Sequence, residues 1–224
     1  MADIGQTPST AEQIAAVELQ TDRPLMICDA DEVLFAFMAA FEAYLTESGH
    51  YFDWSSFALN GNIRRRSDSQ PVEGDQISSL LSNFFKERTA SIAPIPGAAD
   101  TLGRLSQRVQ IVVLSNLPSE QAPARRQALV EHGMDYPLVA NSGPKGPAVS
   151  LLTETIDAPS FFIDDGPNHH KSVAEHAAHV RRLHMIADDR LAKLLGPAPH
   201  SHHRTDDWDA AAAVIESELA NLGY

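Results

Sequence analysis

The chain has 224 residues, of which 43% are apolar and 21% are charged, and its formal net charge is −13. These values are typical of one medium-sized globular domain, or of a domain that carries an insertion. Because phosphate backbones and anionic lipids are bound through basic surfaces, the acidic balance argues against nucleic acids and membranes as main partners.

We do not expect the first twenty residues to act as a secretory signal peptide. The first twenty residues include Asp3, Glu12 and Glu18 and no basic residue, unlike a secretory signal peptide. No run reaches the ~18 apolar residues of a membrane span. The single cysteine, Cys28, excludes an intramolecular disulfide and lies in an apolar run, so we expect a buried thiol. These features predict a cytoplasmic protein.

The first clear apolar run, Leu25–Cys28, stops at two aspartates one residue apart, Asp29 and Asp31. If the strand continues, both side chains lean to the same face; if the chain curls past Asp29, Asp31 folds back over the strand's end. In either case two carboxylates meet at the carboxyl end of a buried strand, where open α/β sheets bind ligands. An aspartate-rich turn is the alternative interpretation.

Residues 35–95 interrupt the alternation of predicted strands and helices. Two apolar helices are predicted, at Leu34–Ser48 and Ile77–Glu87, and the aromatic stretch Tyr51–Ile63 between them has a turn signal at Asn60-Gly61. The segment is far longer than the crossover of about a dozen residues that parallel strands need. We therefore predict a small, mainly helical cap inserted after the first strand.

Beyond residue 95, β-leaning runs alternate with helical stretches. Strands are predicted at Val109–Leu114, Phe161–Ile163 and Val180–Ile186, with a weaker candidate at Tyr136–Ala140. Helices are predicted at Ala98–Gln107, Glu120–His132, Pro147–Thr155, Lys171–Ala178, Asp189–Leu195 and Trp208–Leu222. This alternation favours βαβ units and a parallel sheet covered on both faces. The predicted fold is a three-layer, Rossmann-like α/β core (residues 1–34 and 96–224) with the 35–95 cap.

Four motifs in chain order carry possible chemistry. Asp29-Ala-Asp31 follows the first apolar run, Ser115-Asn116 follows the second, Lys145 lies near the start of a helix, and Asp164-Asp165 follows a later run. In order and spacing, over about residues 24–190, they resemble the haloacid-dehalogenase-like superfamily. The commonest members of that superfamily are magnesium-dependent phosphatases. No single motif is specific, so the resemblance depends on all four together.

The resemblance implies a magnesium-dependent phosphomonoester hydrolase that acts on a small phosphorylated substrate. Asp29 would attack phosphorus and form an aspartyl-phosphate, and Asp31 would protonate the leaving alkoxide and later deprotonate the attacking water. Ser115 and Asn116 would bind the phosphoryl group, and Lys145 would pair with that group and with Asp29.

A divalent cation is expected because Asp29, Asp31, Asp164 and Asp165 are predicted to converge. Carboxylates that share a site repel one another, and Mg²⁺ with its oxygen ligands relieves that repulsion. The resemblance implies that Asp29 and Asp165 bind Mg²⁺ directly, that Asp31 binds it through its backbone carbonyl, and that Asp164 orients a metal-bound water.

Some features depart from the family pattern. Glu32 stands where many relatives have a small residue, and His169, preceded by Asn168, stands where they have Asn or Asp. A phosphotransferase or a dehalogenase on the same fold, or a non-catalytic binding protein, are the alternative functions.

The roles of two basic stretches outside the motifs stay open. Arg64-Arg65-Arg66 is either a solvated loop or the source of an arginine that grips a second anionic group of the substrate. The histidines in residues 199–204 are expected in a solvated loop, because no cysteine or carboxylate spacing supports a closed metal site.

Overall fold

The computed structural model describes residues 8–224 and is built around a six-stranded sheet in the order β5-β4-β1-β6-β7-β8. All neighbouring strands in this sheet are parallel. The strands are β1 (Leu25–Cys28), β4 (Gln110–Asn116), β5 (Leu138–Asn141), β6 (Ser160–Asp164), β7 (Arg181–Met185) and β8 (His203–Thr205). The predicted α/β fold with a parallel sheet is therefore confirmed. The first seven residues of the predicted 1–34 core segment, Asp3 included, lie outside the described residues.

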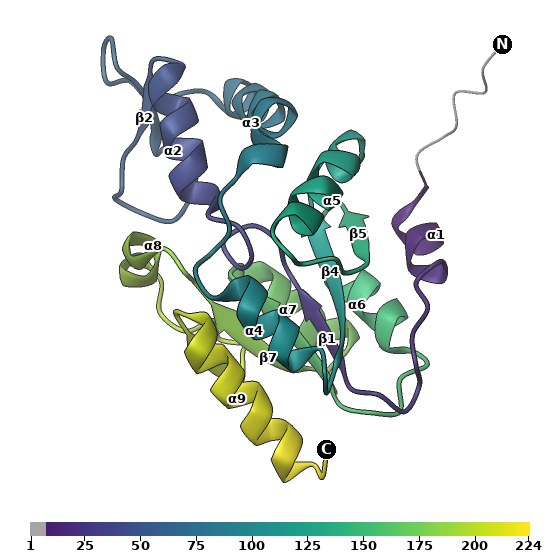
Figure 1. Ribbon diagram of the computed structural model, residues 1–224. Coiled ribbons are helices and arrows are strands. Elements are labelled where there is room, and N and C mark those ends of the chain that lie inside the picture. Colours follow the sequence, from purple (N-terminus) through teal and green to yellow (C-terminus); the bar gives the residue numbers. More distant parts are fainter. Residues whose placement is uncertain (1–7) are drawn as a thin grey trace, which may run out of the picture.

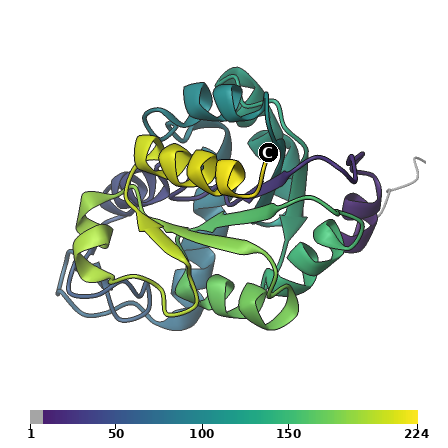
Figure 2. The ribbon, with the colours of Figure 1, turned by 90° about the horizontal axis from the view of Figure 1, so that it is seen from below.

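Both faces of the sheet are buried, because its central strand is apolar throughout. In β1, Met26 and Cys28 pack into one apolar core, whereas Leu25 and Ile27 pack into another on the opposite face. Cys28 is a buried free thiol, as predicted. One face is covered by helices α4 (Ala98–Leu105), α5 (Ala122–Glu131) and α9 (Trp208–Asn221), and the other by α6 (Gly146–Thr153) and α7 (Pro167–His176), as Figures 1 and 2 show.

Two short helices lie at the margins of this core. Helix α1 (Thr10–Ala15) lies beside β5, where the side chains of Thr10 and Gln13 hydrogen-bond to the backbone of Ala140. Helix α8 (Asp189–Leu194) follows β7. No helix among residues 8–224 combines the length and apolar character needed to cross a lipid bilayer.

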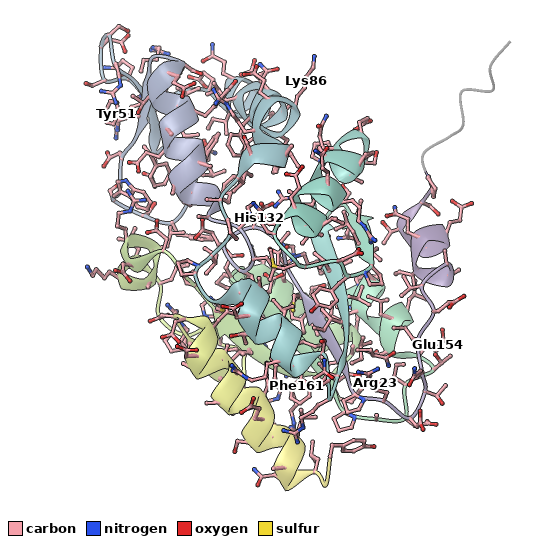
Figure 3. All side chains as sticks on the ribbon, viewed as in Figure 1. Arg23, Tyr51, Lys86, His132, Glu154 and Phe161 are labelled. Atoms are coloured by element: carbon pink, nitrogen blue, oxygen red, sulfur yellow. The ribbon has the colours of Figure 1, made fainter. Side chains whose placement is uncertain are left out.

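Residues 35–95 form two helices and a hairpin next to the carboxyl end of β1 (Figure 1). The elements are α2 (Phe37–Glu47), β2 (His50–Phe52), β3 (Ile63–Arg65), α3 (Gly74–Arg88) and the short 3₁₀ helix η1 (Thr89–Ser91). Phe41 and Phe84 join the two helices, with ring centroids 5.2 Å apart. Tyr51 and Lys86, labelled in Figure 3, lie on the side of this segment that is far from the sheet.

The strand order creates a switch point at β1. The chain adds β4 and β5 on one side of β1 and then returns to add β6, β7 and β8 on the other. Loops that leave the carboxyl ends of the strands diverge at such a point, and open α/β sheets bind their ligands there. This edge of the sheet is therefore the first place to examine for a site.

Several boundaries differ from the sequence predictions. Strand β4 continues through Ser115 and Asn116 instead of stopping before them, and a 3₁₀ turn, η2 (Ser119–Gln121), precedes α5. Helix α7 begins at Pro167 rather than Lys171, because proline fits the first turn of a helix. The loop predicted for residues 199–204 is partly wrong, since His203 begins edge strand β8.

Candidate active site

Three carboxylates converge at the switch point. Asp29 directly follows β1, and its N–H donates to the carbonyl of Ile163 in β6 at 2.9 Å, which keeps the residue in register with the sheet. Asp164 ends β6 and Asp165 follows it. One oxygen from each of Asp29, Asp164 and Asp165 lies within 4.8 Å of the others.

Lys145 lies against two of these carboxylates. Its Nζ is 2.6 Å from Asp29 Oδ1 and 2.6 Å from Asp164 Oδ2, and its side chain is fully buried. The close approach of α6 and α7 places it there: Gly146 N–H donates to Ser172 Oγ at 3.0 Å. A Cβ at Gly146 would lie 2.2 Å from the Ser172 carbonyl oxygen, so only glycine fits.

The charges in this cluster are not balanced. Burial raises the pKa of Asp29 to about 7, although Lys145 opposes the shift. Burial also acts to raise the pKa of Asp164, but Lys145 holds that pKa below its usual range. Burial and the neighbouring Asp164 raise the pKa of Asp165 well above its usual range, and this residue has no ion pair within residues 8–224. Asp165 therefore carries the charge that most needs a cation.

The backbone of the acidic pair is held by two buried imidazoles that the sequence analysis did not single out. His170 Nε2 lies 2.8 Å from the carbonyl oxygen of Asp164, and His184 Nε2 lies 2.9 Å from that of Asp165. Burial lowers the pKa of His170, and it lowers that of His184 to about 4. Because a carbonyl oxygen can only accept, each ring donates from Nε2, which orients the two carbonyl groups.

Ser115 supplies a hydroxyl at the same edge of the sheet. It lies within β4, its side chain is fully buried, and its Oγ has no hydrogen-bond partner among the described residues. A buried hydroxyl without a partner costs free energy, so this group is suited to form a hydrogen bond with a ligand oxygen. Asn116 differs, because its side chain already bonds Gly143 O and Asn141 Nδ2, at 2.8 and 2.7 Å.

The side chain of Asp31 lies outside the tight group formed by Asp29, Asp164 and Asp165, although its charge acts to raise the pKa of Asp29. The reason is a competing cation: Arg125 Nη2 donates to Asp31 Oδ1 at 2.7 Å. Arg125 was not predicted as a site residue.

The two basic stretches contribute nothing to this cluster. Arg64 bonds Asp53, Arg65 bonds Asp68, and Arg66 bonds the carbonyl of His50, so all three are satisfied within the 35–95 segment. The histidines in residues 199–204 form no metal-ligand group with other described residues. In the described part of the chain, the one such group consists of Asp29, Asp164 and Asp165.

The two departures from the family pattern lie close to the site. Glu32 has a left-handed backbone (φ 61°), and its Oε1 accepts from Met38 N at 2.5 Å, so it caps the first turn of α2. His169 is half-buried and its Nδ1 has no partner among the described residues, whereas Asn168 is exposed.

The donor set fits Mg²⁺. Asp29, Asp164 and Asp165 offer hard carboxylate oxygens, and Asp165 lacks a counter-charge. Thiolate and imidazole ligands, which softer metals prefer, are missing from this group of three.

The fold is similar to that of solved structures of haloacid-dehalogenase-like hydrolases. Neither a protein-family model nor a curated protein matches the sequence. Among similar solved structures is a hydrolase of this family from Deinococcus radiodurans R1 with bound phosphate and sodium. It is 14% identical with a TM-score of 0.58, over 89% of this chain and 98% of that chain.

Two further structures show the same architecture. The putative hydrolase YfnB from Bacillus subtilis, bound to magnesium, is 14% identical with a TM-score of 0.56, over 88% of this chain and 99% of that one. CbbY from Rhodobacter sphaeroides, in complex with xylulose-1,5-bisphosphate, is 15% identical with a TM-score of 0.54, over 82% and 94%. At these identities the likeness establishes the shared fold.

Proposed function

We propose that this protein is a magnesium-dependent hydrolase of small phosphomonoesters. The observation that carries the proposal is the pairing of Asp29 with Lys145, at 2.6 Å, beside two further carboxylates. A carboxylate held next to a cation, at the edge of the sheet where ligands bind, is suited to attack phosphorus. The unpartnered hydroxyl of Ser115 supplies a donor for a phosphoryl oxygen.

The reaction divides into two steps. In the first, a carboxylate oxygen of Asp29 bonds to phosphorus while the ester oxygen leaves and takes a proton from Asp31. In the second, water attacks phosphorus, Asp31 takes the proton of that water, and the Asp29 carboxylate is regenerated as inorganic phosphate leaves. Mg²⁺, when bound by Asp29 and Asp165, supplies neutralisation of the negative phosphoryl oxygens.

The structurally similar proteins support this assignment. One of them holds phosphate, one magnesium and one a sugar bisphosphate. We further propose that residues 35–95 act as a cap over the site, because this segment directly follows the Asp29–Asp31 loop.

Hydrolysis of 4-nitrophenyl phosphate in the presence of Mg²⁺ tests the proposal. We expect phosphate release that chelation of the metal abolishes and that Asp29→Asn lowers by at least ~100-fold. Asp100→Asn, which changes an exposed carboxylate on α4, is the matched control and should retain full activity. Full activity of Asp29→Asn would refute the proposal, and Mg²⁺ binding without turnover would favour a non-catalytic binding protein.

A further inference from the structure

Arg125 is a fully buried cation on the core side of α5. With Ala128 and Leu129 it forms the buried face of that helix. Its side chain has no exposed area, and its guanidinium carbon lies 4.9 Å from the centroid of the Phe35 ring. The next residue, Arg126, is exposed and pairs with Asp135, as surface arginines commonly do.

Burying this guanidinium is costly. A charge removed from water destabilises the fold unless it is paired and its donors are satisfied. Only Nη2 of Arg125 has a partner, whereas Nε and Nη1 have none among the described residues. A methionine of similar volume would pack there without that cost, so stability alone does not account for the arginine.

The partner of Arg125 is Asp31, the carboxylate that transfers protons in the proposed reaction. Nη2 donates to Asp31 Oδ1 at 2.7 Å, and the Asp31 side chain keeps 18% of its surface exposed. Oδ2 accepts no hydrogen bond within the described part of the chain. One oxygen is thus fixed from the protein side, and the other is left for a reacting group.

The loop around Asp31 is closed by two backbone hydrogen bonds. Phe35 N–H donates to the carbonyl of Ala30 at 2.8 Å, and Glu32 N–H donates to the carbonyl of Phe35 at 2.8 Å. Arg125 therefore lies against both ends of this turn, the Asp31 carboxylate and the Phe35 ring. Removing it frees rotation of the Asp31 side chain about Cβ–Cγ.

We propose that Arg125 is a positioning residue for Asp31, an inference that rests on the proposed function. By holding Oδ1, it turns Oδ2 toward the leaving-group oxygen. From Oδ2 a proton passes to that oxygen as the P–O bond breaks, and to Oδ2 a proton returns from the water that attacks phosphorus.

The test compares two substrates that differ in their need for an acid. 4-Nitrophenolate leaves without a proton, whereas an alkyl phosphate such as 2-phosphoglycol releases an alkoxide that needs one. We expect Arg125→Met to lower kcat/KM, which reports the departure of the leaving group and not the later hydrolysis that both substrates share, by ~10- to 100-fold for the alkyl phosphate and by less than ~3-fold for the aryl phosphate. Arg125→Lys should restore part of the loss, and Arg126→Met should leave both rates unchanged.

A double-mutant cycle separates positioning from a general structural effect. In an Asp31→Asn background, Arg125→Met should cost almost nothing more on the alkyl phosphate, because the two changes remove one function. Equal losses of kcat/KM on both substrates, or a full additional loss on the alkyl phosphate in that background, would overturn the proposal. If Arg125→Met fails to fold, Arg125→Lys carries the same cycle.

Failure of the proposed function gives a different pattern. If the wild type hydrolyses neither substrate, or if Asp29→Asn keeps its activity, the hydrolase assignment falls. The pairing of Arg125 with Asp31 can then be tested by the melting temperatures of the two single variants and the double variant. Additive effects would show that the two side chains do not interact.

Discussion

Gly146 decides whether Lys145 can reach the carboxylates. It lies at the first turn of α6, and a side chain there would meet the backbone carbonyl of Ser172 in α7 at 2.2 Å. Because that obstacle is backbone, a change of rotamer does not relieve it. The two helices would have to separate, and Lys145 would move with α6.

We therefore expect Gly146→Ala to destabilise the protein by about 1–3 kcal/mol, as overpacking does, and to lower kcat together with stability. The matched control is Gly103→Ala in α4, where a Cβ meets nothing within 4 Å and helix propensity favours alanine. Chemical denaturation with an activity assay measures both variants. Equal stability of Gly146→Ala and wild type would contradict the close packing of α6 and α7.

At the same scale, the sequence predicted that Asp29, Lys145 and the Asp164-Asp165 pair lie together, but it did not predict every partner of the site residues. Asp29 follows β1 and Asp164 ends the neighbouring parallel strand β6, so their meeting at one edge of the sheet follows from the fold class alone. The pairing of Asp31 with Arg125 depends on how α5 packs, which no strand-end motif reports. One signal was present: Arg125 precedes Ala128 and Leu129 at helical spacing, which places it on the apolar face.

Between elements, Arg190 on α8 connects the core to the 35–95 segment. Its Nη1 lies 2.6 Å from Glu42 Oε2 on α2, and its guanidinium carbon lies 3.9 Å from the Trp54 ring. Trp54 Nε1–H in turn donates to Glu42 Oε1 at 3.0 Å. These contacts form a small closed network, although the arginine side chain remains 42% exposed.

We expect Arg190→Met to loosen this attachment more than it destabilises the fold. A half-exposed ion pair and a cation–π contact together contribute on the order of 1 kcal/mol. Hydrogen exchange should therefore rise in α2 and in the loop around Trp54, while the melting temperature changes little. Lys193→Met, which removes an exposed charge on the same helix, is the control. Unchanged exchange in α2 would show that the network does not hold the segment.

Sequence patterns predicted the ends of helices and short edge strands less well than the long buried strands. Helix α7 begins at Pro167, but its first turn contains Asn168, His169 and His170, whose polarity hid the helical period. Strand β8 has only three residues at the edge of the sheet, and no apolar alternation announces it. The long buried runs, by contrast, were predicted because both of their faces are covered.

For the molecule as a whole, the carboxylate cluster links stability to pH and to metal. The pKa of Asp29 is raised to about 7 and that of Asp165 well above its usual range. Without metal, the folded protein therefore holds protons that the unfolded chain has already released above about pH 4. The contribution of these two carboxyl groups to stability therefore falls as pH rises from about 4 through about 7, because they bind more protons in the folded state over that window.

Magnesium competes with those protons, so its stabilising effect must grow over the same window. At about a hundredfold excess over its dissociation constant, Mg²⁺ adds ~2.7 kcal/mol, or roughly 5–10 °C in melting temperature for a chain of this size. We expect that increment at pH 7.5 and a clearly smaller one at pH 5.5. Since each increment is a difference at fixed pH, buried histidines such as His184 contribute equally with and without metal.

Asp165→Asn makes this prediction specific, because it removes the carboxylate that has no counter-charge. The variant should lose the Mg²⁺ increment and yet melt at a higher temperature than the metal-free wild type at pH 7.5, because it removes a carboxyl group whose charged form is disfavoured by burial and by Asp164. Asp100→Asn, an exposed carboxylate on α4, should keep the wild-type increment at both pH values. The crowded carboxylates do not form a metal site if millimolar Mg²⁺ leaves the melting temperature unchanged at pH 7.5. The same conclusion follows if Mg²⁺ raises the melting temperature equally at both pH values.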